Sequence, residues 1–517
     1  MAGPRELAND IRSRLLALVE RAPDRVAVEH GPDRMTAASL VLGSRDLAAT
    51  LDGLPGADSD AAVAILGLPG LARIRGLVGC WLAGLPVAVL DPGQPEPRLG
   101  TALGRLQPRA LVVDATALAR VAGLVRFLPD GVPVVLHDGA SGRALGTWRD
   151  RTPLMVVPRR AGAAWSTSDS PLRGTAAHVW VDTASGGGWV ERSHSALLED
   201  CDRHIVRAEV QPRDRVSRLH RLSGHRGLTD LLIAWSVGGT SSSPGTEVAL
   251  QGGTWLRTAR VAVLRLTPSR LRSMESAGAL TEAAFRGVRS IVLEGEGMRG
   301  RDIATLRRIA PKATIDSIYG RTEIGSALLG HRLQPGPVLE DAAFVPLGRA
   351  LPGIGVAVVD GRGSRVARGQ AGWLAFAGAS GEPIQTGDRV RVESGRGLCH
   401  LGRGDDLVKM RGRRVALGPV GDAIGDIAGA PTVAVAWPLS APGAASGVVA
   451  FVQTDALDTD AILEEARRHL PRDLVPGELL AVPGLPRLED GSVDRARLTR
   501  FLARRGPRAA PDPASGR

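Results

Sequence analysis

The sequence predicts an α/β protein that contains a parallel sheet and has room for two to four domains. Segments 61–66, 71–81 and 86–90 have the patterns of a strand, a helix and a strand, an order that implies parallel strands joined by a crossover helix. The length of 517 residues and the hydrophobic fraction of 44% allow a large core and several domains. Residues 504–517 are rich in Pro, Ala and Arg and predict a disordered tail.

Hydrophobic periodicity and turn residues predict the other elements along the chain. Residues 6–20 have helical spacing, and residues 27–30 (AVEH) predict a strand. Segment 140–175 is polar and rich in Gly and Arg, so it predicts a loop or an edge region. The remaining expected elements are a helix after Pro95, strands at 110–114, 313–318, 432–437 and 448–453, and a helix at 459–469.

Charge and composition argue against a nucleic-acid-binding protein. The formal net charge is +11, but the 65 Lys and Arg residues include only two lysines, Lys312 and Lys409, and the arginines are scattered. Scattered arginines favour a solvated surface over a nucleic-acid interface. The replacement of lysine by arginine is typical of a GC-rich genome such as that of an actinobacterium.

Cysteine spacing and the apolar segments predict a cytoplasmic protein. Cys80, Cys201 and Cys399 are odd in number, lie far apart and have no metal-binding spacing. The N-terminus has no signal-peptide h-region, and arginines and glycines interrupt the apolar stretch 61–89. We therefore expect free thiols and no membrane span.

The stretch DSIYGRTEIG at 316–325 is the most informative one for function. Tyr319 is the only tyrosine in the chain, and it stands between the strand predicted at 313–318 and a turn punctuated by glycines. Loops at strand ends are where α/β proteins usually place ligand contacts. An aromatic face can stack on a base, the Thr322 hydroxyl can donate a hydrogen bond, and the Glu323 carboxylate can hold a metal ion.

Two further segments have the composition of ligand-binding loops. Small residues at 183–188 follow a predicted strand, and they could bring backbone N–H groups and hydroxyls close to an anion. The carboxylate of Asp388, in the tripeptide Thr386-Gly387-Asp388, could accept both hydroxyl protons of a ribose diol. Each signal is weak alone, because a run of glycines is more often a plain turn.

Taken in order, these motifs resemble those of the adenylate-forming ligases, which include acyl-CoA synthetases, fatty acyl-AMP ligases and peptide-synthetase adenylation domains. Residues 319–323 are similar to Y-G-x-T-E, and residues 402–415, GRGDDLVKMRGRRV, are similar to G-R-x-D-D-x-V-K-x-R-G-x-R-[IV]. The resemblance extends from about Glu6 to Leu498. It implies the adenylate-forming ligase fold, in which a large α/β N-terminal domain of layered sheets and helices, here at 1–403, is followed by a small, mobile α+β C-terminal domain, here at 404–503. That C-terminal domain would rotate between two reaction poses.

The resemblance also implies ligands and roles for individual residues. The ligands would be ATP, AMP or an acyl-adenylate, with Mg²⁺ when ATP is used. Thr322 and Glu323 would act in catalysis, Glu323 would hold Mg²⁺, Asp405 would be the hinge, and Lys409 is a retained motif position. The nucleotide would be bound by Tyr319, Gly320, Asp388, Arg403, Gly295 and Glu296. The phosphate loop would comprise Thr183, Ser185, Gly186, Gly187 and Gly188. The substrate pocket would include His225 and Gly227.

Two departures from the family pattern bear on activity. Ser492 stands where the resemblance implies a catalytic lysine, and serine cannot supply positive charge to the attacking carboxylate and the leaving group. The phosphate loop is shortened, and Trp189 and Glu191 stand where Pro-Lys is expected. We therefore expect a divergent member whose ATP-driven adenylation is impaired.

The resemblance also bears on the substrate. His225 and Arg226 lie near the position at which amino-acid-activating members carry an aspartate that binds the substrate ammonium group. A neutral or positive pair cannot serve an ammonium, so an acyl or aryl acid is favoured over an α-amino acid. Capping or packing explains His225 equally well.

Three functions remain open from the sequence. The first is a ligase of secondary metabolism that joins a carboxylic acid to AMP and passes the acyl group to a thiol or an amine, with CoA or an acyl carrier protein as acceptor. The second is a transferase that uses a preformed acyl-adenylate. The third is a non-catalytic partner that binds a nucleotide or a carrier protein.

Overall fold

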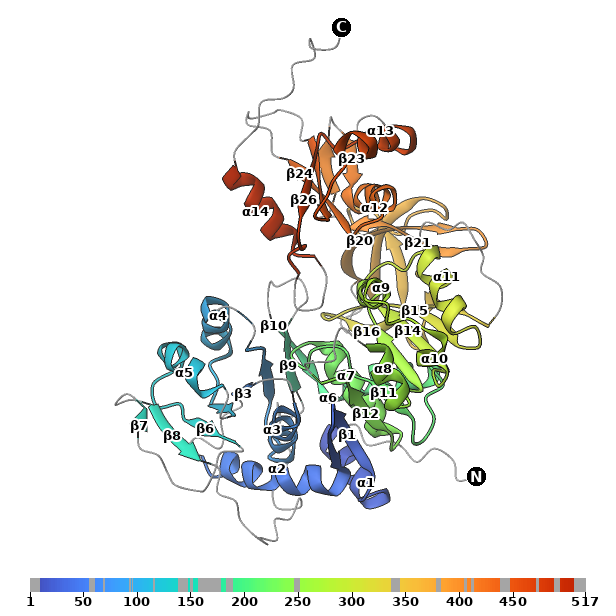
Figure 1. Ribbon diagram of the computed structural model, residues 1–517. Helices are drawn as coiled ribbons and strands as arrows, with labels where there is room; N and C mark the ends of the chain where they lie inside the picture. Colours follow the sequence, from blue (N-terminus) through green and yellow to red (C-terminus); the bar gives the residue numbers. More distant parts are fainter. Residues whose placement is uncertain are drawn as a thin grey trace. The chain divides into compact units, whose positions relative to one another are not determined.

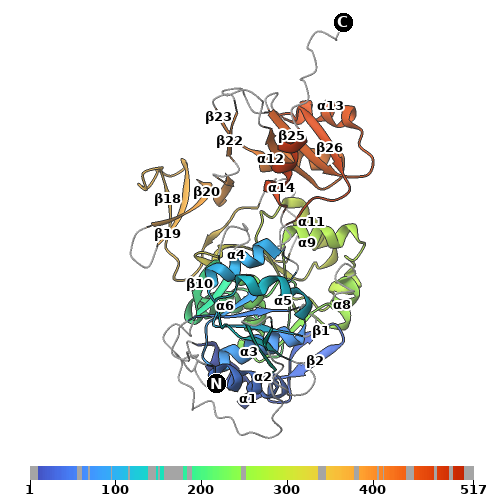
Figure 2. The ribbon, with the colours of Figure 1, turned by 90° about the vertical axis from the view of Figure 1, so that its left-hand side faces the viewer.

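Figure 1 shows a computed structural model of the chain, and Figure 2 shows the same ribbon turned by 90°. Residue contacts divide the chain into two compact units, Met1–Val345 and Pro346–Arg517. The domain boundary predicted after residue 403 lies inside the second unit and stays a prediction. The structure describes residues 10–54, 61–67, 70–92, 94, 96–114, 117–137, 147–148, 152–156, 178–182, 189–245, 252–335, 345–377, 383–403, 407–410, 413–437, 447–470, 474–487 and 493–505.

One large sheet of the first unit carries most of the candidate site. Within this unit its strand order is β16-β15-β14-β13-β11-β12-β1-β2, and all neighbours from β15 to β1 are parallel. The outer strands β2 and β16 are antiparallel to their neighbours. The carboxyl ends of β13, β14 and β15 therefore lie side by side. The bounds are β1 (Val26–His30), β2 (Asp33–Thr36), β11 (Arg215–Ser217), β12 (Thr240–Ser243), β13 (Val263–Leu266), β14 (Ser290–Glu294), β15 (Thr314–Arg321) and β16 (Gly325–Leu333).

The second sheet of this unit has the order β10-β9-β4-β3-β5-β6-β8-β7. It is parallel from β9 to β8, and the strands at its two ends are antiparallel. Strands β7 and β8 fall within segment 140–175, so the described part of that segment forms an edge of the sheet. The bounds are β3 (Val63–Leu66), β4 (Val87–Leu90), β5 (Ala110–Val113), β6 (Val134–Leu136), β7 (Thr147–Trp148), β8 (Thr152–Val156), β9 (His178–Asp182) and β10 (Trp189–Ser193).

Helices pack on both sheets of the first unit. Helix α3 contacts β3 and β4 of one sheet and β1 and β2 of the other, so it lies between them (Figure 1). Helices α6 and α7 pack against each other, and α7 also contacts β11 and β12. The helices are α1 (Ile11–Arg21), α2 (Ala37–Asp52), α3 (Leu71–Leu82), α4 (Glu96–Leu106), α5 (Leu118–Leu124), the 3₁₀ helix η1 (Val125–Phe127), α6 (His194–Arg207), α7 (His225–Ser236), α8 (Gly252–Thr258), α9 (Pro268–Ser276), α10 (Glu282–Phe285) and α11 (Gly300–Ile309).

Local sequence explains why these elements form. Every residue of β3, β4 and β5 is buried, because helices cover both faces of a parallel sheet, and their uninterrupted apolar runs suit that position. Helix α6 begins after Ser193, whose hydroxyl accepts a hydrogen bond from the Ala196 N–H at 3.1 Å. The apolar core beneath the candidate site includes Leu264, Ile291 and Ile315 from β13, β14 and β15.

The second unit is built from smaller sheets. Strands β18 to β21 form an antiparallel sheet, β22 and β23 form a hairpin, and β24, β25 and β26 form a mixed sheet covered by α12, α13 and α14. The bounds are β17 (Arg349–Ala350), β18 (Val356–Val359), β19 (Ala371–Ala377), β20 (Pro383–Glu393), β21 (Gly397–Arg403), β22 (Leu407–Met410), β23 (Arg413–Ala416), α12 (Leu417–Ala428), β24 (Thr432–Trp437), β25 (Gly447–Gln453), α13 (Thr459–His469), β26 (Glu478–Val482) and α14 (Arg495–Arg505).

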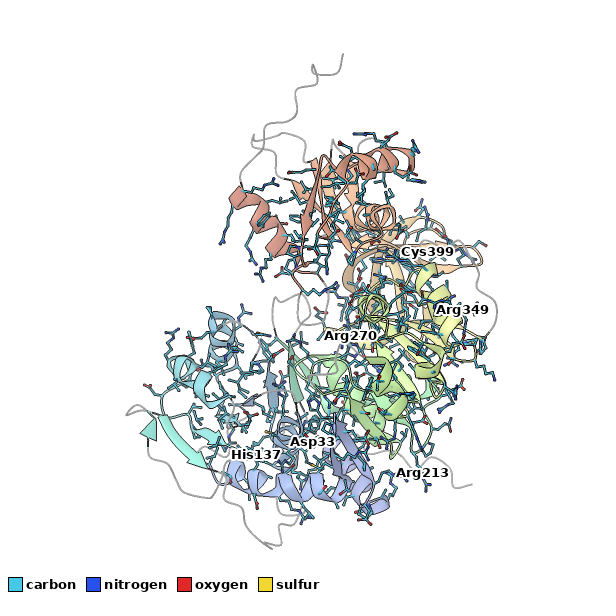
Figure 3. All side chains as sticks on the ribbon, in the orientation of Figure 1. Asp33, His137, Arg213, Arg270, Arg349 and Cys399 are labelled. Carbon is cyan, nitrogen blue, oxygen red and sulfur yellow. The ribbon has the colours of Figure 1, made fainter. Side chains whose placement is uncertain are left out.

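Two predictions about the whole chain can be compared with these units. Cys80, Cys201 and Cys399 are free thiols, as the spacing predicted. All three are buried, and Cys399 is labelled in Figure 3. Among the helices that the structure describes, none has both the length and the apolar composition that a bilayer crossing needs.

Candidate functional site

The Tyr319 stretch forms a hairpin rather than a loop at a strand end, which corrects the sequence prediction. Strand β15 continues to Arg321, and β16 begins at Gly325, with Tyr319 opposite Leu329 and Arg321 opposite Gly325. A Cβ atom on Gly320 would lie 2.1 Å from the carbonyl oxygen of Ser326. Glycine is therefore required at this position because β16 passes too close for any side chain.

A pocket lies beside this hairpin in the first unit. It is bounded by the first residues of α7, by the carboxyl end of β14 and by the two strands of the hairpin. The lining residues are His225, Arg226, Glu294, Gly295, Gly320, Arg321, Thr322 and Ser326. Strand ends and a helix start thus converge at this pocket, as is common at the ligand sites of α/β proteins. Gly320 and Thr322 are among its lining residues, and their roles stay predictions.

His225 is held at the pocket by a buried carboxylate on α6. Its Nε2 atom lies 2.9 Å from Oδ2 of Asp200, which is fully buried. The same carboxylate accepts a hydrogen bond from the Ser326 N–H at 2.8 Å and one from Arg203 at 2.6 Å. Burial alone would raise the pKa of Asp200, but the hydrogen bonds from His225, Ser326 and Arg203 hold that pKa well below its ordinary value.

A second buried network lies under the pocket floor. Arg265, on β13, donates from Nε to Asp230 Oδ1 at 2.6 Å and from Nη2 to Glu294 Oε1 at 2.7 Å. All three side chains are at most 2% exposed. Burial would raise the Glu294 pKa, but Arg265 lowers it to about 2. His204 lies 4.0 Å from Glu294, and burial together with the Arg265 charge lowers its pKa to about 3, so its imidazole is neutral at pH 7.

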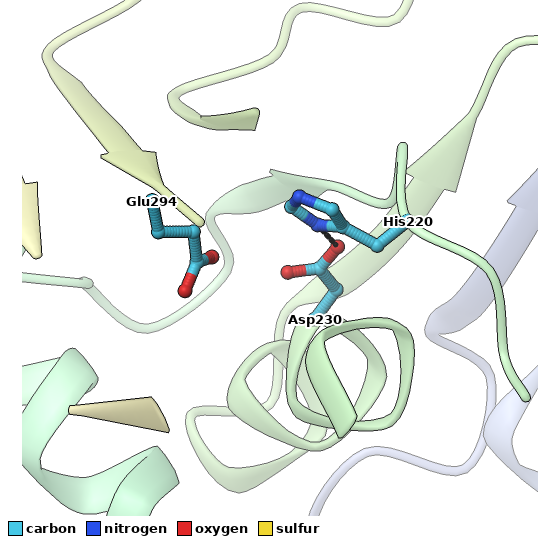
Figure 4. Close-up of side chains that lie close together, drawn as sticks. All are labelled: His220, Asp230 and Glu294. Carbon is cyan, nitrogen blue, oxygen red and sulfur yellow. Dashed lines mark hydrogen bonds and ion pairs between the residues drawn. The ribbon is translucent and has the colours of Figure 1, made fainter. Parts of the chain in front are cut away.

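His220, Asp230 and Glu294 could in principle be metal ligands. Figure 4 shows these side chains, whose ligand-type atoms all lie within 4.8 Å of one another. His220 Nδ1 is 2.8 Å from Asp230 Oδ2, and Arg265 already binds one oxygen of each carboxylate. Because the guanidinium group supplies the positive charge that a metal ion would bring, the cluster is a structural ion-pair network rather than a metal centre.

The two residues predicted to follow β14 have different surroundings. Gly295 lines the pocket with φ of +93°, a conformation that favours glycine, and a Cβ atom there would lie 2.6 Å from the Arg226 guanidinium carbon. Glu296 instead accepts hydrogen bonds from the hydroxyl and the N–H of Ser269, at 2.6 and 3.2 Å, at the start of α9. Its observed contact is thus at a helix start, and its nucleotide role stays a prediction.

Glu323 lies at the tip of the hairpin with its side chain 39% exposed. Its carboxylate lies 3.3 Å from Arg321 Nε, and its backbone carbonyl is 3.5 Å from Arg192 Nη1. An exposed carboxylate with a long ion pair can still exchange that partner for a cation. Mg²⁺ usually binds through one or two protein carboxylates together with substrate phosphates, so Glu323 fits the predicted role.

Gly227 has a structural explanation. A Cβ atom there would lie 2.0 Å from the carbonyl oxygen of Arg221, so glycine lets the first turn of α7 pack on the preceding loop. Gly227 does not line the pocket whose described residues are given above. It positions His225 and Arg226, two and one residues before it, through the backbone.

The second unit contains the residues predicted to bind ribose. Asp388 on β20 stands directly opposite Arg403 on β21. The Asp388 carboxylate is 5% exposed and lies 3.2 Å from His400 Nε2, while the Asp388 N–H donates to the Thr386 hydroxyl at 3.1 Å. Lys409 lies on β22, opposite Arg414. The strand register therefore places Asp388 and Arg403 at opposite positions of neighbouring strands, and their nucleotide roles stay predictions.

Several predicted site residues lie outside the described residues. The predicted phosphate loop falls between β9 and β10, which pair as antiparallel neighbours with Asp182 opposite Trp189. The predictions for these positions stay open. The residues concerned are Thr183, Ser185, Gly186, Gly187, Gly188, Asp405 and Ser492.

Four side chains at the pocket or beneath it are not predicted as site residues from the sequence. Arg265 interrupts an apolar strand, and its carboxylate partners are 35 residues before it and 29 residues after it. Asp200 lies on a helix face whose sequence suggests polar surface. Arg321 and Ser326 stand within the conspicuous Tyr319 stretch or just after it, and the β-like alternation past Gly325 is the available signal for the hairpin.

Comparisons with known proteins agree with this geometry. The family model described as "AMP-binding enzyme" matches residues 16–153 and 190–381. The chain is 26% identical over 512 residues to the L-proline--[L-prolyl-carrier protein] ligase of Pseudomonas fluorescens, covering 95% of this chain and 99% of that protein. It is 28% identical to the probable non-canonical nonribosomal peptide synthetase CymA of Salinispora arenicola, covering 92% of this chain and only 6% of that protein.

A solved structure supports the fold. The crystal structure of the anthranilate CoA ligase AuaEII in complex with anthranoyl-AMP superposes with a TM-score of 0.78 at 17% identity, covering 96% of this chain and 98% of the other. At this identity the likeness is evidence for the fold alone. It agrees with the predicted α/β architecture.

Proposed function

Because the chain belongs to the AMP-binding enzyme family, whose model matches most of it, we propose that it activates or transfers one particular class of carboxylic acid through an acyl-adenylate. The acid is an acyl or aryl acid without an α-amino group, and the acceptor is a thiol or an amine. The relatives include ligases named for carrier proteins, which supports a carrier-protein thiol or CoA as acceptor. The setting is the biosynthesis of a secondary metabolite, which relatives in peptide and novobiocin biosynthesis support.

The observation that carries this proposal is the pocket beside the Tyr319 hairpin. It joins Gly320 and Thr322 of the adenylate-forming motif to His225 and Arg226 of the predicted substrate pocket. In the nucleotide role, the Tyr319 ring would stack on the base, and Thr322 would donate a hydrogen bond to a phosphate oxygen. Mg²⁺ held by Glu323 would neutralise phosphate charge when ATP is the ligand.

The charges at the pocket argue against a substrate ammonium group. An ammonium needs a carboxylate that is not already neutralised. Glu294 is bonded to Arg265 at 2.7 Å, and Asp200 is bonded to Arg203 at 2.6 Å. The L-proline ligase is a relative that acts on an amino acid, so the substrate proposed here differs from that of this relative.

Weak adenylation is the second part of the proposal, and it rests on Ser492 and on the altered phosphate loop. A lost charged donor at a reacting group costs about 10²–10³-fold in rate. Such a protein would still bind AMP and accept an acyl-adenylate. The part of the site that binds the nucleoside would then be intact, whereas attack of the substrate carboxylate on ATP would be slow.

Two assays on the purified protein test the proposal. One measures ATP–pyrophosphate exchange with a panel of carboxylic acids that includes amino acids, and the other measures consumption of synthetic acyl-adenylates with CoA or a carrier-protein thiol. Slow exchange with non-amino acids and faster acyl-adenylate consumption would support it. Exchange that is fast and specific for an α-amino acid would contradict it, and AMP binding without either reaction would indicate a non-catalytic partner.

A further inference from the structure

The Arg226 side chain contributes a positive charge to the wall of the pocket. Arg226 lies in the first turn of α7 and lines the pocket together with His225. Its guanidinium group packs over the backbone of Gly295, where a Cβ atom would come within 2.6 Å of Cζ and Nη1 and 2.7 Å of Nη2. Since Gly295 also has φ of +93°, both the backbone conformation and the missing side chain leave room for this guanidinium group.

The carboxylates around Arg226 already have other partners. Glu294 is bonded to Arg265, Asp200 to Arg203, and the Glu323 carboxylate lies 3.3 Å from Arg321. The Arg226 charge helps to lower the Glu294 pKa from a distance, but its guanidinium group makes no direct hydrogen bond or ion pair within the described part of the chain. Arg226 is half-buried, and none of its nitrogen atoms is among the buried side-chain atoms without a hydrogen-bond partner, so its planar set of donors is open to a ligand.

The pocket wall is polar throughout. None of the described lining residues carries a purely hydrocarbon side chain; they are Arg, His, Glu, Ser, Thr and Gly. The wall carries two arginines, Arg226 and Arg321, and one carboxylate, Glu294. Because Arg265 neutralises the Glu294 charge from below, positive charge is in excess at the wall. A small ligand group with negative charge complements such a wall better than an alkyl or phenyl group does.

We propose that Arg226 binds an oxyanion of the ligand at this pocket, an inference that rests on the proposed function. The planar guanidinium group suits a bidentate contact with a carboxylate or a phosphate. Two sources present this chemistry: a second acidic group on the activated acid, or a phosphate oxygen of AMP or the acyl-adenylate. In either case Arg226 contacts the ligand directly, and the absence of a side chain at Gly295 leaves room for its guanidinium group.

Two substitutions of Arg226 test this inference by binding rather than by turnover. Arg226→Gln removes the charge and keeps much of the side-chain length, and Arg226→Lys keeps the charge without the planar fork. Arg257→Gln is the matched control, because Arg257 is exposed on α8 and its substitution removes the same charge away from the pocket. Calorimetry would measure the Kd of each protein for AMP and adenosine, and for succinate and butyrate in the presence of AMP.

The measured pattern separates the two sources. If the oxyanion is a phosphate oxygen, Arg226→Gln weakens AMP at least 10-fold and leaves adenosine unchanged. If it is a second acidic group, the variant leaves AMP unchanged and loses at least 10-fold of the preference for succinate over butyrate. Arg226→Lys would show a smaller loss in the same ligand, and Arg257→Gln no loss. Folding of each variant is checked by its near-UV circular dichroism.

Two results would overturn the inference, and they differ in what else they contradict. If wild type binds these ligands and Arg226→Gln binds all of them equally well, the inference fails and the proposed function stands. If wild type binds neither AMP nor either acid, the proposed function fails and the inference fails with it.

Discussion

Replacing Arg265 with Met should destabilise the sheet under the candidate pocket by about 3–5 kcal/mol. Arg265 is 1% exposed and bonds to two carboxylates that are themselves at most 2% exposed. Removing one partner of a buried ion pair leaves uncompensated charge, and this typically costs about 3–5 kcal/mol. The Glu294 pKa supports the scale, because its decrease from 4.5 to about 2 corresponds to about 3 kcal/mol at roughly 1.4 kcal/mol per pKa unit.

The loss depends on pH in a direction that the Glu294 pKa determines. Because this pKa is lower in the folded protein than in the unfolded chain, the stabilisation is present above about pH 4.5 and is lost as the pH falls toward 2. The difference between wild type and Arg265→Met should therefore be largest at pH 7 and shrink below pH 4.5. Adding Glu294→Gln to the variant should recover part of the loss at pH 7, because one buried charge is removed.

The local free energy of unfolding is measured by titrating with urea while monitoring the hydrogen exchange of backbone amides in β13, β14 and β15. Arg257→Met on α8 is the control, and an exposed substitution of this kind should change stability by less than about 0.5 kcal/mol. A loss below about 1 kcal/mol for Arg265→Met, or an equal loss at pH 7 and pH 3, would refute the reasoning.

Three further perturbations have defined outcomes. Gly320→Ala places a Cβ atom 2.1 Å from the Ser326 carbonyl oxygen, so the affinity for AMP, measured by calorimetry, should fall at least 10-fold. The control is Gly104→Ala, whose Cβ atom meets nothing within 4 Å. This control should bind AMP normally and be stabilised by about 0.4–1 kcal/mol. The pKa of His204 is lowered to about 3 in the folded protein, so the free energy of unfolding should fall as the pH drops below 6.5, by at most about 1.4 kcal/mol per pH unit. His204→Gln should remove this contribution to the pH dependence of stability, which acid titration measures. Asp388→Asn, which keeps the shape and removes the charge, should weaken adenosine binding by about 1–3 kcal/mol, and unchanged affinity would contradict the ribose role.

The order and type of many elements could be predicted from local sequence. The strand at 432–437 and the helix at 459–469 form at the predicted residues, and the strand, helix and strand of 61–90 form within two residues of prediction. These segments are short and strongly apolar or strongly periodic, so local pattern and tertiary packing agree. The motif order also indicates that Gly320, Thr322 and His225 belong to one site, and all three line the same pocket.

The hairpin at Tyr319 shows where local reasoning fails. The sequence predicts a turn at Gly320, but the strand continues through this residue and pairs with β16, which passes so close that a Cβ atom would lie 2.1 Å from the Ser326 carbonyl oxygen. A glycine in a strand and a glycine in a turn look alike in one sequence. Only the position of the neighbouring strand distinguishes them.

The buried charges could not be predicted for a different reason. Arg265 finds Asp230 on α7 and Glu294 at the end of β14, and nothing in the residues next to it specifies either partner. Partner choice depends on the strand order of the sheet, which brings β13 and β14 side by side. The pairing of Asp200 with His225 likewise depends on the packing of α6 against α7.

The most direct test of the proposed function is ATP–pyrophosphate exchange measured side by side for wild type and Ser492→Lys with the same panel of acids. Restoring a positive charge at this position should raise exchange by about 10²–10³-fold for the preferred acid, with AMP affinity unchanged. Arg497→Lys, an exposed change on α14 that introduces a lysine elsewhere, is the matched control and should leave exchange at the wild-type rate. Wild-type exchange that is already fast, and that Ser492→Lys does not raise, would contradict the account of an impaired adenylation step.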